Sequence, residues 1–101
     1  MLPKKIFAVA DWQARARSVE VLYFAWVRDR VGTAREHVNP PDTVTTVGEL
    51  ALWLATQSKE HAEAFRDSEV LRAAVNHEHV SFAHPIATGD EVAFFPPMTG
   101  G

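Results

Sequence analysis

The last nine residues, AFFPPMTGG, form the segment whose residue types most directly suggest chemistry. Glycine loses more backbone entropy on ordering than any other residue, so a Gly-Gly pair on its own is typical of a frayed terminus. Neither residue carries a Cβ, so the pair can also adopt backbone angles that other residues resist. Pro96 and Pro97 restrict φ and favour an extended spacer, and they suit the end of a strand equally well.

Three histidines, His77, His79 and His84, are the second candidate for chemistry. Imidazole is a good zinc ligand, and residues two apart share one face of a strand. The chain has no cysteine, and no firmly placed carboxylate completes a ligand set, so we interpret them as surface histidines and predict no metal site. Neither a Ser/His/Asp spacing nor a glycine-rich phosphate loop is found, and the sequence indicates no independent active site.

The composition is that of one ordinary globular domain. The 101 residues are 47% hydrophobic and 23% charged, and the absence of cysteine excludes disulfides, thiolate metal sites and cysteine nucleophiles. From residue 19 onward, six Lys and Arg stand against twelve Asp and Glu. Such an acidic domain disfavours nucleic acid and suits a basic protein partner.

The first 18 residues are basic and then briefly apolar. The apolar stretch Ile6–Ala10 is shorter than the roughly 7–15 residues of a signal peptide, and no segment approaches the ~18 apolar residues of a membrane span. We therefore expect no membrane association and a cytoplasmic location. Residues 1–18 are treated as an N-terminal extension whose order the sequence does not define, and 19–101 as one domain with a flexible tail over 96–101.

The domain is predicted to begin with two paired strands. Val19–Val27 is rich in β-branched and aromatic residues, which favours a central strand buried on most of both faces. Arg28–Gly32 then reads as a short helical turn stopped by glycine, and Ala34–Val38 as a second strand that forms a hairpin with the first.

The clearest helix start lies at Thr46. Thr46 and Glu49 have capping-box spacing, which predicts that the Thr46 hydroxyl accepts from the Glu49 N–H and that the Glu49 carboxylate accepts from the Thr46 N–H. The helix is expected to last to about Ser58. Its predicted buried stripe comprises Val47, Leu50, Ala51 and Leu54, with Trp53 beside it.

The remaining pattern completes a mixed sheet. A second short helix is predicted over 60–66, with Ala62 and Phe65 turned inward. Strands are predicted over 71–76, 79–82 and 91–95, with turns at 77–78 and 88–90. The order ββαβ(β)β predicts an α+β architecture, in which one main helix packs across one face of a mixed sheet and the final strand pairs beside the first.

Three segments, VLYFAWVRDRVGT, LRAAVNHEHVSFAHPI and GDEVAFFPPMTGG, carry a resemblance. They resemble the small subunits of molybdopterin synthase, which are sulfur carriers with a ubiquitin-like β-grasp fold. The resemblance spans Val19 to Gly101. Relatives commonly have Val-Ser or Val-Thr where this chain has Met98-Thr99, a change that keeps one apolar and one small hydroxyl residue.

The resemblance implies a chemical role for the terminal carboxylate of Gly101. In this family a ubiquitin-activating-like adenylyltransferase uses ATP and Mg²⁺ to adenylate the carboxylate, and a sulfur donor system converts it to a thiocarboxylate. The tail then enters the synthase large subunit and gives sulfur to cyclic pyranopterin monophosphate, twice for each molybdopterin dithiolene. The carrier is a non-catalytic, sulfur-donating subunit that binds no cofactor, and two small and two large subunits form a heterotetramer.

The resemblance also implies which residues do this work. Met98, Thr99 and Gly100 would thread the partner's tunnel, with Pro96 and Pro97 as the stiff spacer. Phe24 and Phe95 match family positions on the exposed side of the sheet that contact the partners, and Arg28 is a weaker candidate for a polar contact. The alternative for the two phenylalanines is that they belong to the core.

Two other functions remain open from the sequence. One is a β-grasp carrier of another pathway, such as thiamine thiazole synthesis, or a protein modifier that is conjugated to its targets. The other is a binding module with an idle tail. Adding one residue after Gly101 separates them, because carriers and modifiers should lose function and a binding module should not.

Overall fold

The computed structural model describes residues 18–97, which form one five-stranded mixed sheet in the order β2-β1-β5-β3-β4. The strands are β1 (Val19–Tyr23), β2 (Arg35–Val38), β3 (Arg72–Val75), β4 (Glu78–Val80) and β5 (Glu91–Phe95). The helices are α2 (Ala25–Val31), α3 (Val47–Leu54), α4 (Lys59–Ala64) and the 3-10 helix η1 (Ser68–Val70). β1 and β5 pair in parallel and the other pairs are antiparallel, so the predicted α+β class and the pairing of the last strand beside the first are confirmed.

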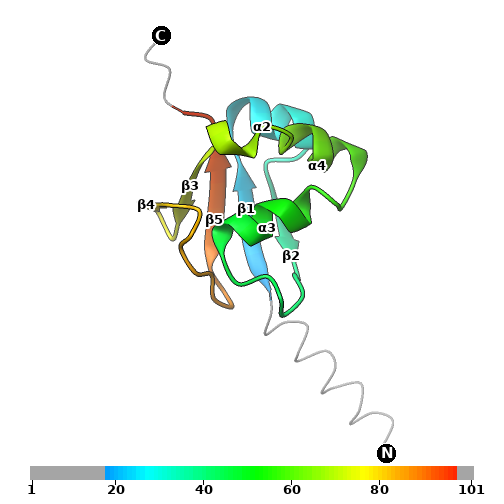
Figure 1. The fold of residues 1–101 in the computed structure, drawn as a ribbon. Helices are drawn as coiled ribbons and strands as arrows, with labels where there is room; N and C mark the ends of the chain where they lie inside the picture. The colour runs from blue at the N-terminus through cyan, green and yellow to red at the C-terminus, as the bar shows by residue number, and fades with distance from the viewer. Residues whose placement is uncertain (1–17, 98–101) are drawn as a thin grey trace, which may run out of the picture.

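The helices cover one face of this sheet and one of its ends. Figure 1 shows α3 crossing in front of β1 and β5, with α2 and α4 at the end of the sheet where these two strands finish. No helix formed by residues 18–97 covers the opposite face, so we call it the open face. None of the helices within residues 18–97 has the length and apolar character needed to cross a bilayer.

The prediction of a first strand reaching Val27 is wrong. The strand ends at Tyr23, and Ala25–Val31 is a helix in which Val27 and Val31, four residues apart, are both buried. Burial at a helical period therefore outweighs the strand propensity of this run. The predicted stop at Gly32 is confirmed, since Gly32 caps the helix in the left-handed conformation at φ 99°.

Half of the predicted capping box is present at α3. The Thr46 hydroxyl accepts from the Glu49 N–H at 3.1 Å, as expected. The Glu49 carboxylate, however, accepts from the backbone N–H and the hydroxyl of Thr45, at 2.7 and 2.8 Å, and not from Thr46. These hydrogen bonds lower the pKa of the Glu49 carboxyl. The box thus closes one residue earlier than its usual spacing predicts.

The end of α3 also differs from the prediction. The helix ends at Leu54, not near Ser58, and Ser58 instead caps α4 by accepting from the His61 N–H at 3.0 Å. The second short helix is confirmed, one residue earlier at its start. Phe65 is buried as predicted, whereas Ala62 is exposed and Ala64 takes the inward position.

The core lies between the sheet and the helices. The predicted stripe of α3 is fully buried, with Trp53 partly buried against it. Three aromatic rings meet edge to face over β5: the ring centroid of Phe65 lies 5.0 Å from that of Phe94, and Phe82 lies 6.1 Å from Phe94. Such contacts add to the stabilisation from buried area.

A chain of polar contacts fastens α4 to the edge of this core. The Tyr23 hydroxyl donates to Glu36 Oε2 at 2.7 Å, His61 Nε2 lies 2.7 Å from the same oxygen, and Ser58 Oγ lies 2.7 Å from His61 Nδ1. Burial alone would raise the pKa of the Glu36 carboxyl, but the hydrogen bonds with His61 and Tyr23 lower it overall. Burial, with the Glu36 carboxylate second, raises the pKa of the Tyr23 phenol.

Candidate functional site at the open face and the tail

The central strand β5 delivers the tail to one end of the sheet. It pairs with β1 in parallel and with β3 on its other side, and Tyr23 lies opposite Phe94 in the β1 register. The end of β5 therefore lies where β1 turns into α2, as Figure 1 shows, and Pro96 and Pro97 follow it in the chain. The residues predicted to thread and to react, Met98, Thr99, Gly100 and Gly101, lie outside the described residues.

Phe24 and Phe95 come together on the open face beside this exit. The Phe24 N–H donates to the Phe94 carbonyl at 3.2 Å, which fixes the turn from β1 into α2 against β5. Phe24 is 46% exposed and Phe95 is half-buried, and both line one shallow hollow of about 240 Å³. The two rings therefore stand outside the core, and the alternative that both are core residues is wrong.

Small apolar side chains form the floor of this hollow. Its lining residues are Leu22, Phe24, Ala74, His77, His79, Glu91, Ala93 and Phe95. Leu22, Ala74 and Ala93 come from three adjacent strands, and the register places Leu22 opposite Ala93 and Ala93 opposite Ala74. Sequence reasoning missed these three. Leu22 and Ala93 alternate with buried neighbours, which marks the other face of β1 and β5, whereas Ala74 lies in a run of three buried residues that gives no such signal.

Arg28 lies on α2 outside this hollow, and it lines a different one together with Asp29, Gly32, Thr33 and Ala34. Its N–H points to the Phe24 carbonyl at 3.4 Å, one helical turn away, and its Nε lies 3.7 Å from Asp29 Oδ1. About half of the Arg28 side chain is exposed.

Two of the three histidines belong to the open face. The His79 ring centroid lies 5.2 Å from that of Phe95, and His77 Nε2 lies 3.8 Å from Glu91 Oε1. His84 lies apart from them, in the loop after β4, and its own carbonyl accepts from the Val47 N–H of α3. The residues from 18 to 97 contain no group of three or more His, Asp or Glu arranged to hold a metal ion.

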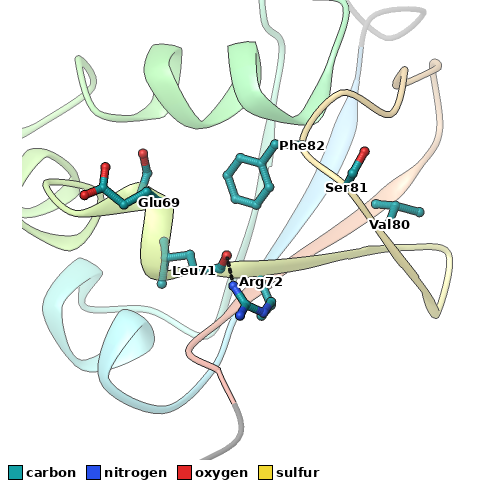
Figure 2. A pocket seen from close by; sticks show the side chains of 7 residues that line it. Glu69, Leu71, Arg72, Val80, Ser81 and Phe82 are labelled. Carbon is teal, nitrogen blue, oxygen red and sulfur yellow. Dashed lines mark hydrogen bonds between the residues drawn. The ribbon is translucent and has the colours of Figure 1, made fainter.

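A second pocket, of about 360 Å³, lies between η1 and the segment after β4. It is lined by Ser68, Glu69, Leu71, Arg72, Val80, Ser81 and Phe82. Figure 2 shows the Phe82 ring between Glu69 on one side and Ser81 and Val80 on the other, with Arg72 donating to the Leu71 carbonyl at 3.4 Å. The lining includes no histidine.

The mixed sheet and the helix across one face define a ubiquitin-like β-grasp fold, which is the fold of the sulfur-carrier class. The family model described as "ThiS family" matches residues 21–101, and the chain belongs to that family. The match covers all of the predicted tail residues.

Individual relatives place the chain more closely within the family. It is 49% identical over 83 residues, 82% of this chain and 99% of the relative, to the molybdopterin synthase sulfur carrier subunit of Escherichia coli K12. Molybdopterin converting factor subunit 1 of Pyrococcus furiosus has a similar structure, with TM-score 0.66 and 28% identity over 80% of this chain and 98% of that one. Small archaeal modifier protein 1 of Haloferax volcanii is similar at TM-score 0.65 and 27% identity, over 83% and 99%.

Proposed function

We propose that this protein is the sulfur-carrier subunit of a molybdopterin synthase. The observation that carries the proposal is the 49% identity to the E. coli carrier subunit, which extends over 99% of that relative. The fold contributes a second argument, because β5 and the two prolines that follow it end beside an uncovered apolar face. A protein that carries a group on its last residue needs both features.

The reacting atom in this proposal belongs to Gly101. A free carboxylate is a poor acyl donor, since oxide would have to leave. Attack of the carboxylate on the α-phosphorus of ATP, in the partner's site and with its Mg²⁺, forms the acyl-adenylate and releases pyrophosphate. A donor at the oxidation level of sulfide then displaces AMP, which leaves a thiocarboxylate.

The thiocarboxylate makes the carrier a sulfur nucleophile without any cysteine of its own. Its sulfur would pass to cyclic pyranopterin monophosphate in the large subunit, and hydrolysis of the resulting acyl group would return the carboxylate. One carrier supplies one sulfur, so two loaded carriers complete one dithiolene. All of these steps use metabolites of the cell interior, and we infer a cytoplasmic location.

The open face supplies the binding surface for both partners, the large subunit and the adenylyltransferase. Phe24 and Phe95 are exposed beside the tail exit, and Arg28 stands one turn away on α2. Pro96 and Pro97 would hold the tail straight as Met98, Thr99 and Gly100 thread the tunnel. Because Gly100 lacks a Cβ, a Gly100→Val substitution should block entry while leaving residues 18–97 folded.

Alkylation of the C-terminus tests the proposal directly. The purified protein is incubated with extract of its source cells, ATP, Mg²⁺ and a sulfur donor, treated with iodoacetamide and analysed by fragment mass spectrometry. Because the chain has no cysteine, an ATP-dependent label on Gly101 identifies the thiocarboxylate. Mass gain alone is insufficient, since exchange of oxygen for sulfur nearly equals oxidation of Met98.

A variant extended by one alanine after Gly101 is the matched control and should remain unlabelled. An unlabelled wild-type terminus, in an extract that loads a known carrier, would contradict the proposal. The resemblance to small archaeal modifier protein 1 keeps a second candidate, a conjugated protein modifier. ATP-dependent attachment of Gly101 to lysines of other proteins, without rescue of molybdopterin synthesis in a carrier-deficient strain, would favour that candidate.

A further inference from the structure

The charges of the described domain are divided unevenly between its two sides. Four of its six basic side chains lie on the open-face strands or on α2 at the tail exit: Arg28, Arg30, Arg35 and Arg72. Only three of its twelve acidic side chains, Glu20, Asp29 and Glu91, share that side. The acidic excess read from the sequence therefore lies mostly outside the open-face positions of the strands and outside α2.

The acidic groups of the open face already have cationic neighbours. Glu20 Oε2 lies 2.9 Å from Arg35 Nη1, and Glu91 Oε1 lies 3.8 Å from His77 Nε2. Arg72 stands opposite Phe95 in the β3–β5 register, next to the tail exit. The face is close to neutral when its histidines are neutral, and protonation of the histidines makes it cationic.

Three histidines stand on this face around its apolar floor. His77 and His79 line the hollow, and His37 lies opposite Glu20 in the β1–β2 register. The charged groups facing them from the other strands are Glu20 on β1, Arg35 on β2, Arg72 on β3 and Glu91 on β5, while Glu78 of β4 is directed to the helix side. Imidazole is the side chain whose charge changes between pH 5 and 8.

We propose that the open face docks on a protein surface with an apolar centre and an acidic rim, and that His77 and His79 make this docking tighten as the pH falls. The inference rests on the proposed function and names the chemistry of the partner surface that receives the tail. An apolar partner centre would cover Phe24, Phe95 and the floor between them. Partner carboxylates at the rim would then face Arg28, Arg72 and the two histidines.

Charge complementarity decides whether binding to the partner becomes tighter or weaker as the pH falls. A basic rim, which the total charge of the sequence favours, would meet two arginines and, on acidification, two imidazolium groups. Like charges across an interface are costly, whereas carboxylates in the same places gain attraction as each histidine is protonated. The His79 ring lies against Phe95, inside the area that docking would cover.

Binding measurements with the large subunit of molybdopterin synthase from the same organism test the inference. The dissociation constant is measured by calorimetry at pH 6, 7 and 8 for the wild type, for the double variant His77→Gln and His79→Gln, and for His84→Gln. His84 is a matched control, because it is exposed and lies in the loop at the start of α3. We expect the wild type and H84Q to bind about 3- to 10-fold more tightly at pH 6 than at pH 8, and the double variant to lose most of this change.

Arginine reversal provides a second readout at one pH. Arg72→Glu and Arg66→Glu change the net charge equally, but Arg66 lies after α4 and pairs with Glu63 at 2.9 Å, away from the open face. We expect R72E to weaken binding about 5-fold or more and R66E to change it less than about 2-fold.

The possible outcomes distinguish failure of this inference from failure of the proposed function. Binding that is independent of pH, or a double variant with the wild-type pH profile, would overturn the inference and leave the proposed function standing. Tighter binding by R72E would overturn it as well, since that result requires a basic rim. No binding at any pH, by a carrier whose Gly101 can be loaded with sulfur, would contradict the assignment to this synthase and the inference together.

Discussion

Neighbouring residues of β5 lie on opposite faces of the sheet and meet different surroundings. Phe94 is fully buried and touches the rings of Phe65 and Phe82 edge to face. Phe95 is half-buried on the open face, where its ring neighbour is the exposed His79. Residue type is thus a poor guide to the work a side chain does here, because strand alternation assigns one phenylalanine to stability and the next to recognition.

Truncating each phenylalanine should separate these roles. Phe94→Ala removes a ring from a closely packed core and is expected to lower the free energy of unfolding by about 3–5 kcal/mol. Phe95→Ala is expected to lower it by only about 1 kcal/mol, because the ring is half-exposed, and to weaken binding to the large subunit at least about 10-fold. Urea unfolding and calorimetry measure the two effects.

Two results would contradict this contrast between Phe94 and Phe95. Equal loss of stability in both variants would place Phe95 in the core in solution, and unchanged binding by F95A would remove it from the docking surface. Because F94A is only marginally stable on this expectation, its binding is compared at low temperature after circular dichroism has shown that it is folded.

The contribution of the helix-covered face to stability can also be tested by the effect of pH on a Glu36 variant. The folded pKa of Glu36 is lowered overall, so its contribution to stability is present above the unfolded value of about 4.3 and is lost as the pH falls through the folded value. Glu36→Gln should therefore cost about 1–2 kcal/mol at pH 7, and its difference from the wild type should shrink toward pH 3.

Glu63→Gln is the control for this prediction. Glu63 pairs with Arg66 at 2.9 Å, but both side chains are more than half exposed, so we expect a change below about 0.5 kcal/mol at any pH. Urea unfolding from pH 3 to 8 measures both variants. A deficit of E36Q that stays constant down to pH 3 would show that the charge of Glu36 does not contribute.

Much of the fold could be predicted because its strongest signals are local. Thr46 capped α3 as expected, Gly32 ended α2, and β5 followed its period-2 pattern to Phe95. Val27 was misassigned because a run of β-branched and aromatic residues suits a strand and a short buried helix alike. Only the packing of the chain decides between them.

The candidate site was predictable in part, for a similar reason. Phe24 and Phe95 were expected on the exposed side of the sheet from the family resemblance alone, and the structure places both there. The association of His79 with Phe95 was not foreseen, because it depends on the register between β3 and β4. Nor could the total charge reveal that most of the acidic groups lie away from the open face.

The smallest expected change in stability concerns the turn between β3 and β4. Its two residues differ in role, since one is anchored within the turn and the other points to the open face. Asn76 and His77 both have positive φ, 50° and 74°, the pattern of a two-residue hairpin turn that favours Asn-Gly. The Asn76 side chain is anchored, since it donates to Asp90 Oδ1 at 2.9 Å and accepts from the Glu91 N–H at 3.0 Å. His77 has no such anchor in the turn and points to the open face, where it approaches Glu91.

Glycine at each turn position should therefore act in opposite directions. His77→Gly relieves the left-handed conformation and is expected to raise the free energy of unfolding by about 0.5–1 kcal/mol, whereas Asn76→Gly loses the two side-chain hydrogen bonds and should lower it by about 1 kcal/mol. Thermal unfolding measures both. A destabilised H77G would show that the histidine stabilises the turn; a stabilised H77G with weaker docking at pH 6 would mean that the strain is retained at His77 for recognition, as strained positions at functional sites often are.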